Sequence, residues 1–203
     1  MQIKVCGITE QKNLSDLDAL GVDMVGLNFY PKSSRFLDTS LDLINIKAQK
    51  VGVFVNATKE FIRSKCEEFH LDAIQLHGDE SEDFCSQFDS HIRVIKVFRV
   101  HDDFDMDMAN DWNHASMLLF DTRTSAFGGS GKKFNWHKLD EYRGDFQFLL
   151  SGGIGPEDSI SIAAFEHPKF AGVDINSRFE IKPGLKDTNL VNRFIPDLKV
   201  KKG

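Results

Sequence analysis

Short apolar runs recur along the chain and are separated by longer stretches of mixed polarity. The runs are rich in Val, Ile, Leu and Phe, which is typical of strands that are buried on both faces. They predict eight strands, at residues 3–6, 24–29, 51–55, 73–76, 93–98, 117–120, 146–150 and 171–175. Segments between them, such as EQKNLSDLDAL and TKEFIRSKCEEF, have the periodicity of amphipathic helices, whereas HDDFDMDMANDW after the fifth strand is acidic and only loosely periodic.

Eight strands that alternate with helices favour a parallel sheet that closes on itself, a (β/α)8 TIM barrel. A doubly wound open sheet is the structural alternative. We favour the barrel because the strands number eight and because polar residues and glycines follow them. The chain of 203 residues is near the lower size limit of this fold. We therefore expect a single domain over residues 1–203, with short loops and a short frayed C-terminal tail in KVKKG.

Composition and charge narrow the range of partners. Hydrophobic residues make up 41% of the chain and charged residues 28%, as in ordinary soluble proteins. The formal net charge of −6 argues against a nucleic-acid or anionic-membrane partner. No stretch approaches the ~20 apolar residues of a membrane span and no basic leader precedes the first apolar run, so we expect a cytoplasmic protein. Cys6, Cys66 and Cys85 form no CxxC pair, which predicts reduced thiols and neither disulfide nor metal site.

Polar residues and glycines stand directly after most of the predicted strands. In a barrel of this kind the carboxyl ends of the strands and the following loops carry the chemistry. In chain order these ends are Cys6-Gly7, Asn28-Phe29-Tyr30, Asn56, His77-Gly78-Asp79, Arg99, Asp121, Ser151-Gly152-Gly153 and Asn176-Ser177. His77 and Asn56 are each open to a substrate contact or to a structural hydrogen bond at a strand end.

The seventh and eighth strand ends indicate a phosphate site. Gly152 and Gly153 begin SGGIGPED, where Pro156 suits the first turn of a helix. Glycines let the backbone approach an anion without interference from a Cβ atom, and a helix N-terminus supplies free N–H groups. With Asn176 and Ser177 after the eighth strand, this is the usual phosphate position of such barrels. The alternative is that the glycines only form tight turns.

Alternation along the strands predicts which side chains face the barrel interior. If Cys6 faces the axis, then Lys4 does so too, while Ile3 and Val5 pack on the helices. By the same reasoning Asp121 shares a face with Leu119 and Met117, and Asn176 shares one with Asp174. We therefore predict that Lys4 and Asp174 belong to an interior polar network.

Cys6 and Asp121 are the candidates for proton transfer. Most lone thiols are buried apolar groups, but Cys6 ends a strand just before a helix that Thr9 can cap, and a nearby helix N-terminus favours the thiolate. Asp121 follows three apolar residues, and a partly desolvated carboxyl there suits a general acid. Asp121 has an equally plausible structural reading, as a cap or as the ion-pair partner of Arg123.

These motifs together resemble the phosphoribosylanthranilate isomerase family of tryptophan biosynthesis. Nearly the whole chain takes part in the resemblance, through KVCGIT, GLNFYPKSSRFL, VGVFVN, IQLHGDE, FDTRT, GGSGKKFNW, SGGIGPED and GVDINSRFEIKPGLKD. The family implies an Amadori rearrangement of N-(5'-phosphoribosyl)anthranilate to 1-(2-carboxyphenylamino)-1-deoxyribulose 5-phosphate. Such an enzyme is an aldose–ketose isomerase, formally an intramolecular oxidoreductase, and needs neither metal nor organic cofactor.

The resemblance also implies roles for individual residues. Asp121 would protonate the ribose ring oxygen, and Cys6 would remove the proton from the sugar carbon next to the imine. Arg35 would lie near the anthranilate carboxylate. The phosphate would be bound by Gly152, Gly153, Asn176 and Ser177, and Gly129, in the glycine-rich loop FGGSGKKFNW, would contact the substrate.

The sequence departs from the family pattern at a few positions. Ser130 stands where Thr is commoner, and Asn135 where Asp is usual. Arg178 stands where the family often has Gly, so the last phosphate loop either differs in conformation or gains a guanidinium contact.

Two other kinds of protein remain as alternatives. One is another sugar-phosphate barrel enzyme, such as an indole-glycerol-phosphate synthase or a pentose-phosphate epimerase. These need catalytic lysines and glutamates, or a metal with its ligands, at the strand ends, and neither pattern is seen. The other is a non-catalytic phosphate-binding barrel, which would need neither Cys6 nor Asp121.

Overall fold

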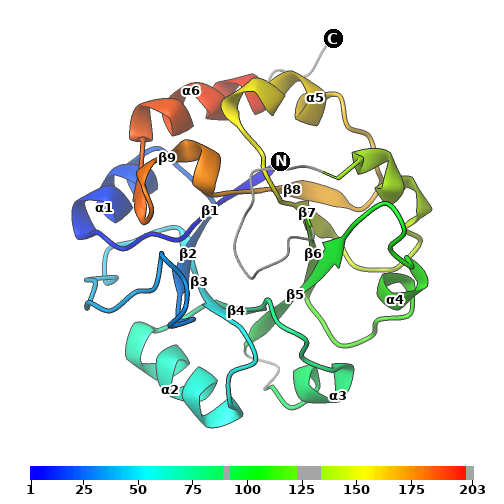
Figure 1. The fold of residues 1–203 in the computed structure, drawn as a ribbon. Helices are drawn as coiled ribbons and strands as arrows, with labels where there is room; N and C mark the ends of the chain where they lie inside the picture. The colour runs from blue at the N-terminus through cyan, green and yellow to red at the C-terminus, as the bar shows by residue number, and fades with distance from the viewer. Residues whose placement is uncertain (89–91, 123–133, 200–203) are drawn as a thin grey trace.

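The computed structural model describes residues 1–88, 92–122 and 134–199, and its centre is a closed barrel of eight parallel strands. Each strand pairs with the next along the chain, and the last pairs with the first, as Figure 1 shows in a view down the barrel. The strands are β1 (Gln2–Cys6), β2 (Met24–Asn28), β3 (Gln49–Phe54), β4 (Ala73–Leu76), β5 (Arg93–Val100), β6 (Met117–Thr122), β7 (Phe148–Leu150) and β8 (Phe170–Ile175). The predicted (β/α)8 barrel is confirmed, and the open sheet is excluded.

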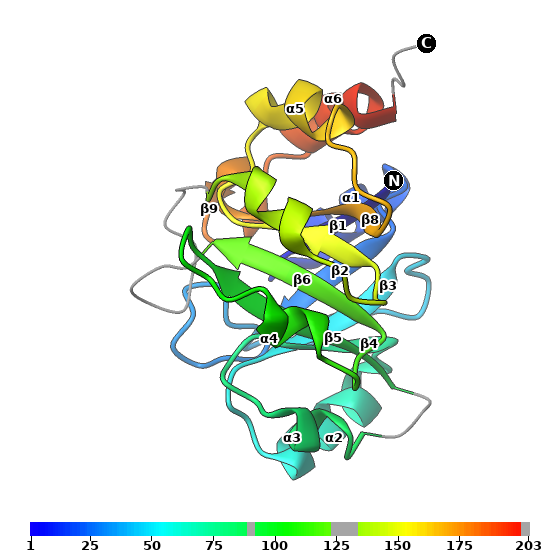
Figure 2. The ribbon, with the colours of Figure 1, turned by 90° about the vertical axis from the view of Figure 1, so that its right-hand side faces the viewer.

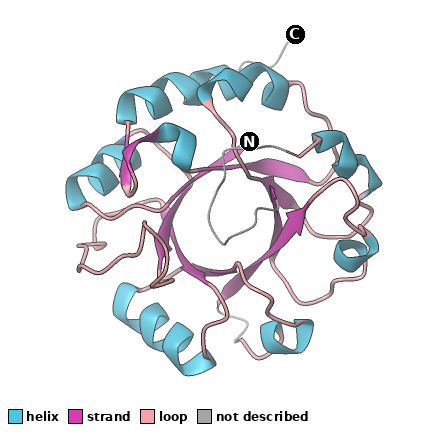
Figure 3. Cartoon of the chain, viewed as in Figure 1, coloured by secondary structure: helices cyan, strands magenta, loops and turns pink. Residues whose placement is uncertain are grey.

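Helices form the outer layer around the strands (Figure 3). Figure 2 shows α5 and α6 on one side of the barrel and α2 and α3 on the opposite side. The α-helices are α1 (Gln11–Ala19), α2 (Lys59–Phe69), α3 (Glu82–Cys85), α4 (Asp107–Asn110), α5 (Ser159–Ala163) and α6 (Thr188–Lys199). Short 3-10 turns are η1 (Trp136–Glu141), η2 (Pro156–Asp158) and η3 (Ser177–Phe179), and a small antiparallel pair is formed by β9 (Glu180–Lys182) and β10 (Leu185–Lys186).

The helical layer is thin after β5, where α4 has only four residues. Asp103, Asp107 and Asp111 follow one another at intervals of four, so a longer helix here would stack like charges on one face. Between β2 and β3 the chain forms turns and no helix. The predicted frayed tail covers residues 199–203, of which 200–203 lie outside the described residues.

The buried apolar side chains of the strands form two layers, one facing the helices and one facing the barrel interior. Ile3 and Val5 belong to the large cluster between strands and helices. The barrel interior is filled by a second cluster of Met24, Val51, Ala73, Ile95, Val97, Met117, Leu119 and Leu149. The predicted facing of β1 and β6 is confirmed, since Met117 and Leu119 lie inside, below Asp121. Among the described residues, no helix has the length and apolarity of a membrane span.

Candidate active site

A pocket opens at the carboxyl ends of the strands, where the sequence predicted the chemistry to be. Its lining includes each predicted site residue in the described part of the chain, namely Cys6, Arg35, Asp121, Gly152, Gly153, Asn176 and Ser177. Asn28, Gln75, His77 and Asp174 also line it. Gly129 and Arg123 lie outside the described residues, so the predictions for them stay predictions.

Cys6 ends β1 and is only 5% exposed. Its thiol sits against Gly26 of β2, where an added Cβ would come within 2.7 Å of the Cys6 Sγ atom, so glycine makes room for the sulfur. The chain then turns at Gly7, whose φ of +76° favours glycine. Burial raises the pKa of the Cys6 thiol above its ordinary value, and the neighbouring Lys4 ammonium opposes that rise.

The prediction that Thr9 caps the following helix is wrong. Helix α1 begins at Gln11 after Glu10, and no side chain caps it. The Thr9 hydroxyl instead donates to the Gly184 carbonyl at 3.1 Å, because the loop that precedes β10 packs against the turn after β1. The cationic influence on Cys6 comes from the two buried lysines Lys4 and Lys186.

Asp121 is the last residue but one of β6 and contacts His77, which follows β4. The Asp121 Oδ2 atom lies 3.1 Å from His77 Nε2, and the Thr122 backbone N–H donates to Oδ1 at 2.9 Å. His77 Nδ1 in turn lies 3.1 Å from the side-chain amide of Gln75. His77 therefore both lines the pocket and holds the candidate acid in place.

Two proton arrangements fit the Gln75–His77–Asp121 chain. If Gln75 donates to Nδ1, the neutral ring carries its proton on Nε2 and donates to an ionised Asp121. Gln75 Oε1 is buried and has no hydrogen-bond partner among the described residues. Rotating the amide would let Oε1 accept a hydrogen bond from Nδ1–H, and Nε2 would then accept a hydrogen bond from a protonated Asp121. The same contacts thus accommodate the carboxyl in both of its states.

Both glycines of the turn after β7 have a left-handed backbone, which favours glycine. Gly152 and Gly153 have φ values of +90° and +68°. A Cβ atom at Gly152 would lie 2.4 Å from the Thr122 backbone nitrogen, so β6 and β7 approach too closely here for any other residue. Pro156 then begins η2, as predicted, and Gly155 N–H donates to the Asp158 carboxylate at 2.7 Å.

Arg178 is not part of the pocket lining. It lies in the 3-10 turn η3, so it needs no left-handed backbone. Its guanidinium Nη2 donates to Glu157 at 2.7 Å, and both side chains are about half exposed, outside the pocket lining. Arg178 is thus engaged by Glu157, and the two readings of this departure stay predictions.

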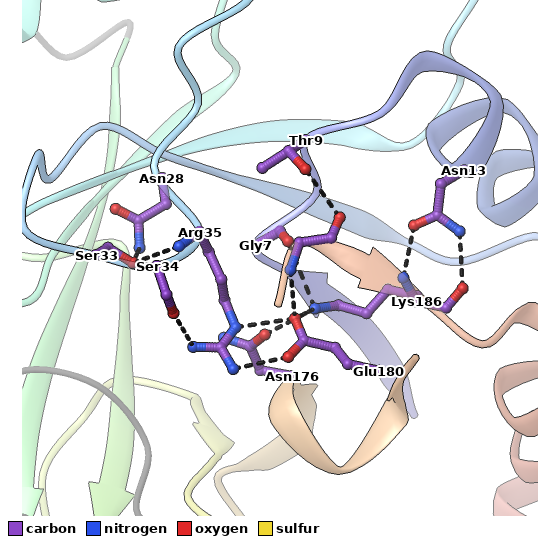
Figure 4. A network of polar contacts seen from close by, with 11 residues as sticks. Gly7, Thr9, Asn13, Asn28, Ser33, Ser34, Arg35, Asn176, Glu180 and Lys186 are labelled. Carbon is purple, nitrogen blue, oxygen red and sulfur yellow. Dashed lines mark hydrogen bonds and ion pairs between the residues drawn. The ribbon is translucent and has the colours of Figure 1, made fainter. Parts of the chain in front are cut away.

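Arg35 enters the pocket from the loop after β2 and is fixed by Glu180 (Figure 4). Its Nε and Nη2 atoms donate to the two carboxylate oxygens of Glu180 at 2.8 and 2.7 Å. This side-on pairing leaves the outer edge of the guanidinium, formed by Nη1 and Nη2, on the side away from Glu180, and Nη1 there donates to the Ser34 hydroxyl at 3.5 Å. Burial would raise the pKa of Glu180, but hydrogen bonds from Arg35 and Lys186 lower it below its ordinary value.

Lys186 of β10 joins three parts of the site (Figure 4). Its ammonium donates to Glu180, to the Asn176 side chain at 2.7 Å and to the Gly7 carbonyl at 3.5 Å. The turn after β1, the end of β8 and the partner of Arg35 therefore share one fully buried cation. Burial lowers the pKa of Lys186, and Glu180 opposes that change.

Comparison with known proteins decides the family. A family model described as N-(5'-phosphoribosyl)anthranilate (PRA) isomerase matches residues 3–197. The chain belongs to the phosphoribosylanthranilate isomerase family. Relatives named N-(5'-phosphoribosyl)anthranilate isomerase include one from Parabacteroides distasonis, 41% identical over 98% of this chain and 93% of its own length. Another, from Thermotoga neapolitana, is 39% identical over 98% of both chains.

Solved structures of phosphoribosylanthranilate isomerases share the fold along the whole chain. The Thermotoga maritima enzyme superposes with a TM-score of 0.83 at 33% identity, over 98% of each chain. A structure of a phosphoribosyl anthranilate isomerase, at 30% identity and a TM-score of 0.79 over 98% of each chain, is a complex with reduced 1-(o-carboxyphenylamino)-1-deoxyribulose 5-phosphate. The family resemblance read from the sequence is thus confirmed.

Proposed function

We propose that the chain catalyses the Amadori rearrangement of N-(5'-phosphoribosyl)anthranilate, with Asp121 as general acid and Cys6 as general base. The observation that carries this proposal is the placement of both groups on one pocket beside the Gly152–Gly153 turn. The pocket thus presents a proton donor, a proton acceptor and an anion site to one ligand. Family membership supplies the reaction class, an aldose–ketose isomerisation.

The chemistry conserves atoms, and two of its proton transfers at the sugar are assigned to protein groups. Asp121 gives a proton to the ring oxygen, the bond between that oxygen and C1 breaks, and the anthranilate nitrogen lone pair forms a C=N bond. Cys6 takes the proton from C2, and the electron pair forms a C1–C2 double bond while the nitrogen becomes a neutral amine. The resulting enol loses the proton of its C2 hydroxyl to water and gains a proton from water at C1, which gives the ketone at C2. Each transfer of this kind typically contributes 10²–10⁴-fold in rate.

The two anionic ends of the substrate match two separate parts of the pocket. The phosphate is assigned to Gly152, Gly153, Asn176 and Ser177, where positive-φ glycines expose the backbone. The anthranilate carboxylate is assigned to the outer edge of Arg35, where it would replace the long contact between Nη1 and the Ser34 hydroxyl. Gly129 stays predicted as a further substrate contact.

The test is an assay in which phosphoribosyl anthranilate is generated in situ and its fluorescence is followed. Wild type should remove the fluorescence, and Asp121→Asn should lose at least about 100-fold in kcat. Cys6→Ser is assayed beside Asp121→Asn, and Cys66→Ser is the matched control for Cys6→Ser, since Cys66 is a half-buried thiol outside the pocket. A wild-type protein that leaves the fluorescence unchanged would show a phosphate-binding barrel without this activity, and an Asp121→Asn variant at full rate would refute the assignment of the acid.

Three broader expectations accompany the proposed activity. We propose that residues 1–203 form one domain, that the partner is a small sugar phosphate and not a nucleic acid, and that the protein works in the cytoplasm. A single cooperative unfolding transition checks the first expectation, and two separate transitions would contradict it. Retention of a nucleic acid at physiological salt, or recovery in the membrane fraction of cells, would contradict the other two.

A further inference from the structure

Lys4 is an unusual residue for a barrel interior. Its side chain is 0% exposed, and its Nζ atom lies 3.0 Å from Asp174 Oδ1. A buried ammonium is costly unless it is paired, and the Asp174 carboxylate supplies the pairing. Lys4 does not line the pocket itself. It lies one layer below the pocket, and the chemistry assigned so far gives it no part.

The strand geometry places Lys4 between Cys6 and Asp174. Lys4 and Cys6 alternate onto the same face of β1, and the register of β1 with β8 sets Lys4 opposite Asp174. Lys4 donates a hydrogen bond to Asp174 at 3.0 Å, and its positive charge lowers the pKa of the Cys6 thiol on the same face. An ammonium has only donors, and a thiolate accepts a hydrogen bond from it better than a thiol does.

We propose that Lys4 is a positioning residue for the proton transfer, which stabilises the ionised, proton-accepting form of the Cys6 sulfur against the effect of burial while Asp174 holds the ammonium in place. This inference rests on the proposed function, in which Cys6 is the base. It assigns to one buried ion pair an influence on the charge state of the thiol.

Other charged groups surround Cys6 and set the sign of each expected effect. Lys186 of β10 reaches the Gly7 carbonyl, while Arg35, paired with Glu180, packs against Gly7. His77 and Asp121 line the same pocket. These groups are unchanged in the variants below, so the comparison isolates Lys4 and Asp174.

The two members of the ion pair act on the thiol in opposite directions. Burial raises the pKa of Cys6, Lys4 lowers it, and Asp174 raises it by a smaller amount than Lys4 lowers it. Lys4→Met should therefore raise the pH at which the thiol ionises, and Asp174→Asn should lower it. The double variant should give a smaller rise than Lys4→Met alone. A role that is only structural would not produce opposite signs.

The experiment measures thiol ionisation directly as well as activity. Thiolate ultraviolet absorbance is titrated for each variant and for the same variant with Cys6→Ser, so that the difference reports Cys6 alone. The pH dependence of kcat/KM is measured in parallel. Lys4→Met should move the midpoint of both curves upward by about one pH unit or more, the shift expected when an opposite charge next to an ionising group is lost.

Lys96→Met is the matched control for loss of a buried lysine. Lys96 also lies almost fully buried, and its Nζ atom pairs with Glu80 at 3.3 Å. Its substitution should destabilise the fold to a similar extent while the Cys6 midpoint stays in place. An equal shift in Lys96→Met and Lys4→Met would overturn the proposal.

The remaining outcomes separate this proposal from the proposed function. An unchanged or lowered midpoint in Lys4→Met, with Cys6→Ser inactive, refutes the role of Lys4 and leaves the proposed function intact. A raised midpoint with Cys6→Ser at full rate refutes Cys6 as the base, and the role of Lys4 in catalysis falls with it. If Lys4→Met does not fold, the double variant, which leaves no unpaired buried charge, carries the test, and an unchanged midpoint there overturns the proposal.

Discussion

Replacing Glu180 by glutamine tests how the site holds its arginine. Glu180→Gln keeps the size of the side chain but removes the charge that pairs with Arg35 and Lys186. The three side chains are only 5%, 12% and 0% exposed, so the two cations would be left without compensation in a partly dry environment. Breaking a buried ion pair in this way typically costs about 3–5 kcal/mol of folding free energy. We expect a loss of about 3 kcal/mol in urea unfolding.

The same variant should weaken substrate binding more than it slows the chemistry. The glutamine amide can accept from one guanidinium N–H only, because its NH2 group faces the other as a second donor. Arg35 then loses one charged hydrogen bond, worth about 1.5–3 kcal/mol, and its outer edge turns away from the anthranilate carboxylate. This corresponds to a rise in KM of about 10- to 100-fold with kcat within about threefold of wild type.

Steady-state kinetics and urea unfolding measure the two effects of Glu180→Gln separately. Asp79→Asn is the control, since Asp79 also pairs with an arginine, Arg99, but is 66% exposed. That exposed pair should contribute less than about 1 kcal/mol, with KM unchanged. If Glu180→Gln kept the wild-type KM, or lowered kcat while KM stayed constant, the assignment of Glu180 as the residue that orients Arg35 would be wrong.

Three further predictions concern the glycine turn, the acid and the response to pH. Gly152→Ala should lose about 2 kcal/mol or more of folding free energy and raise KM, because the φ of Gly152 is +90° and an added Cβ would overlap Thr122. The control Gly21→Ala, at a φ of +75° with open space around it, should lose only about 1–2 kcal/mol and keep the wild-type KM. Equal losses of the two variants in urea unfolding would contradict this prediction. His77→Ala should lower kcat about tenfold with KM nearly constant, because Asp121 loses its hydrogen bond to His77, worth ~1.4 kcal/mol. An unchanged kcat would show that Asp121 does not need this hydrogen bond. Because the pKa of Glu180 is lowered in the folded protein, the ionised carboxylate stabilises the fold fully above its ordinary pKa, and this stabilisation is lost as pH falls through the lowered value. The difference in unfolding free energy between wild type and Glu180→Gln should therefore shrink below about pH 4. A constant difference down to about pH 2 would contradict this.

The barrel and its polar interior were predictable because they follow from strand periodicity. Apolar runs fix the strands, and alternation fixes which side chains face inward. The Lys4–Asp174 network was therefore predicted although 170 residues separate the two side chains, and the ion pair confirms it. The placement of the candidate site residues at one rim follows from the same rule, because parallel strands bring their carboxyl ends together.

The parts that could not be predicted depend on contacts between loops. Glu180 and Lys186 were not singled out as site residues, although FEIKPGLKD holds a Pro-Gly turn signal between two short runs. That signal indicates a hairpin, but nothing local shows that Glu180 pairs with Arg35, 145 residues earlier. The expectation for Thr9 failed for the same reason. Its hydroxyl is engaged by Gly184 from the far end of the chain, and this contact outweighs local capping.

The most direct test of the account is the kinetic effect of Cys6→Ser. A serine hydroxyl is nearly the same size as the thiol but is a far weaker acid, so almost none of it is ionised at neutral pH and the base is lost. The account predicts a fall in kcat of at least about 100-fold, a KM within about threefold of wild type, and an unfolding free energy close to that of the matched Cys66→Ser variant. A Cys6→Ser protein that isomerises phosphoribosyl anthranilate at the wild-type rate would contradict the assignment of Cys6 as the base, and with it the central claim.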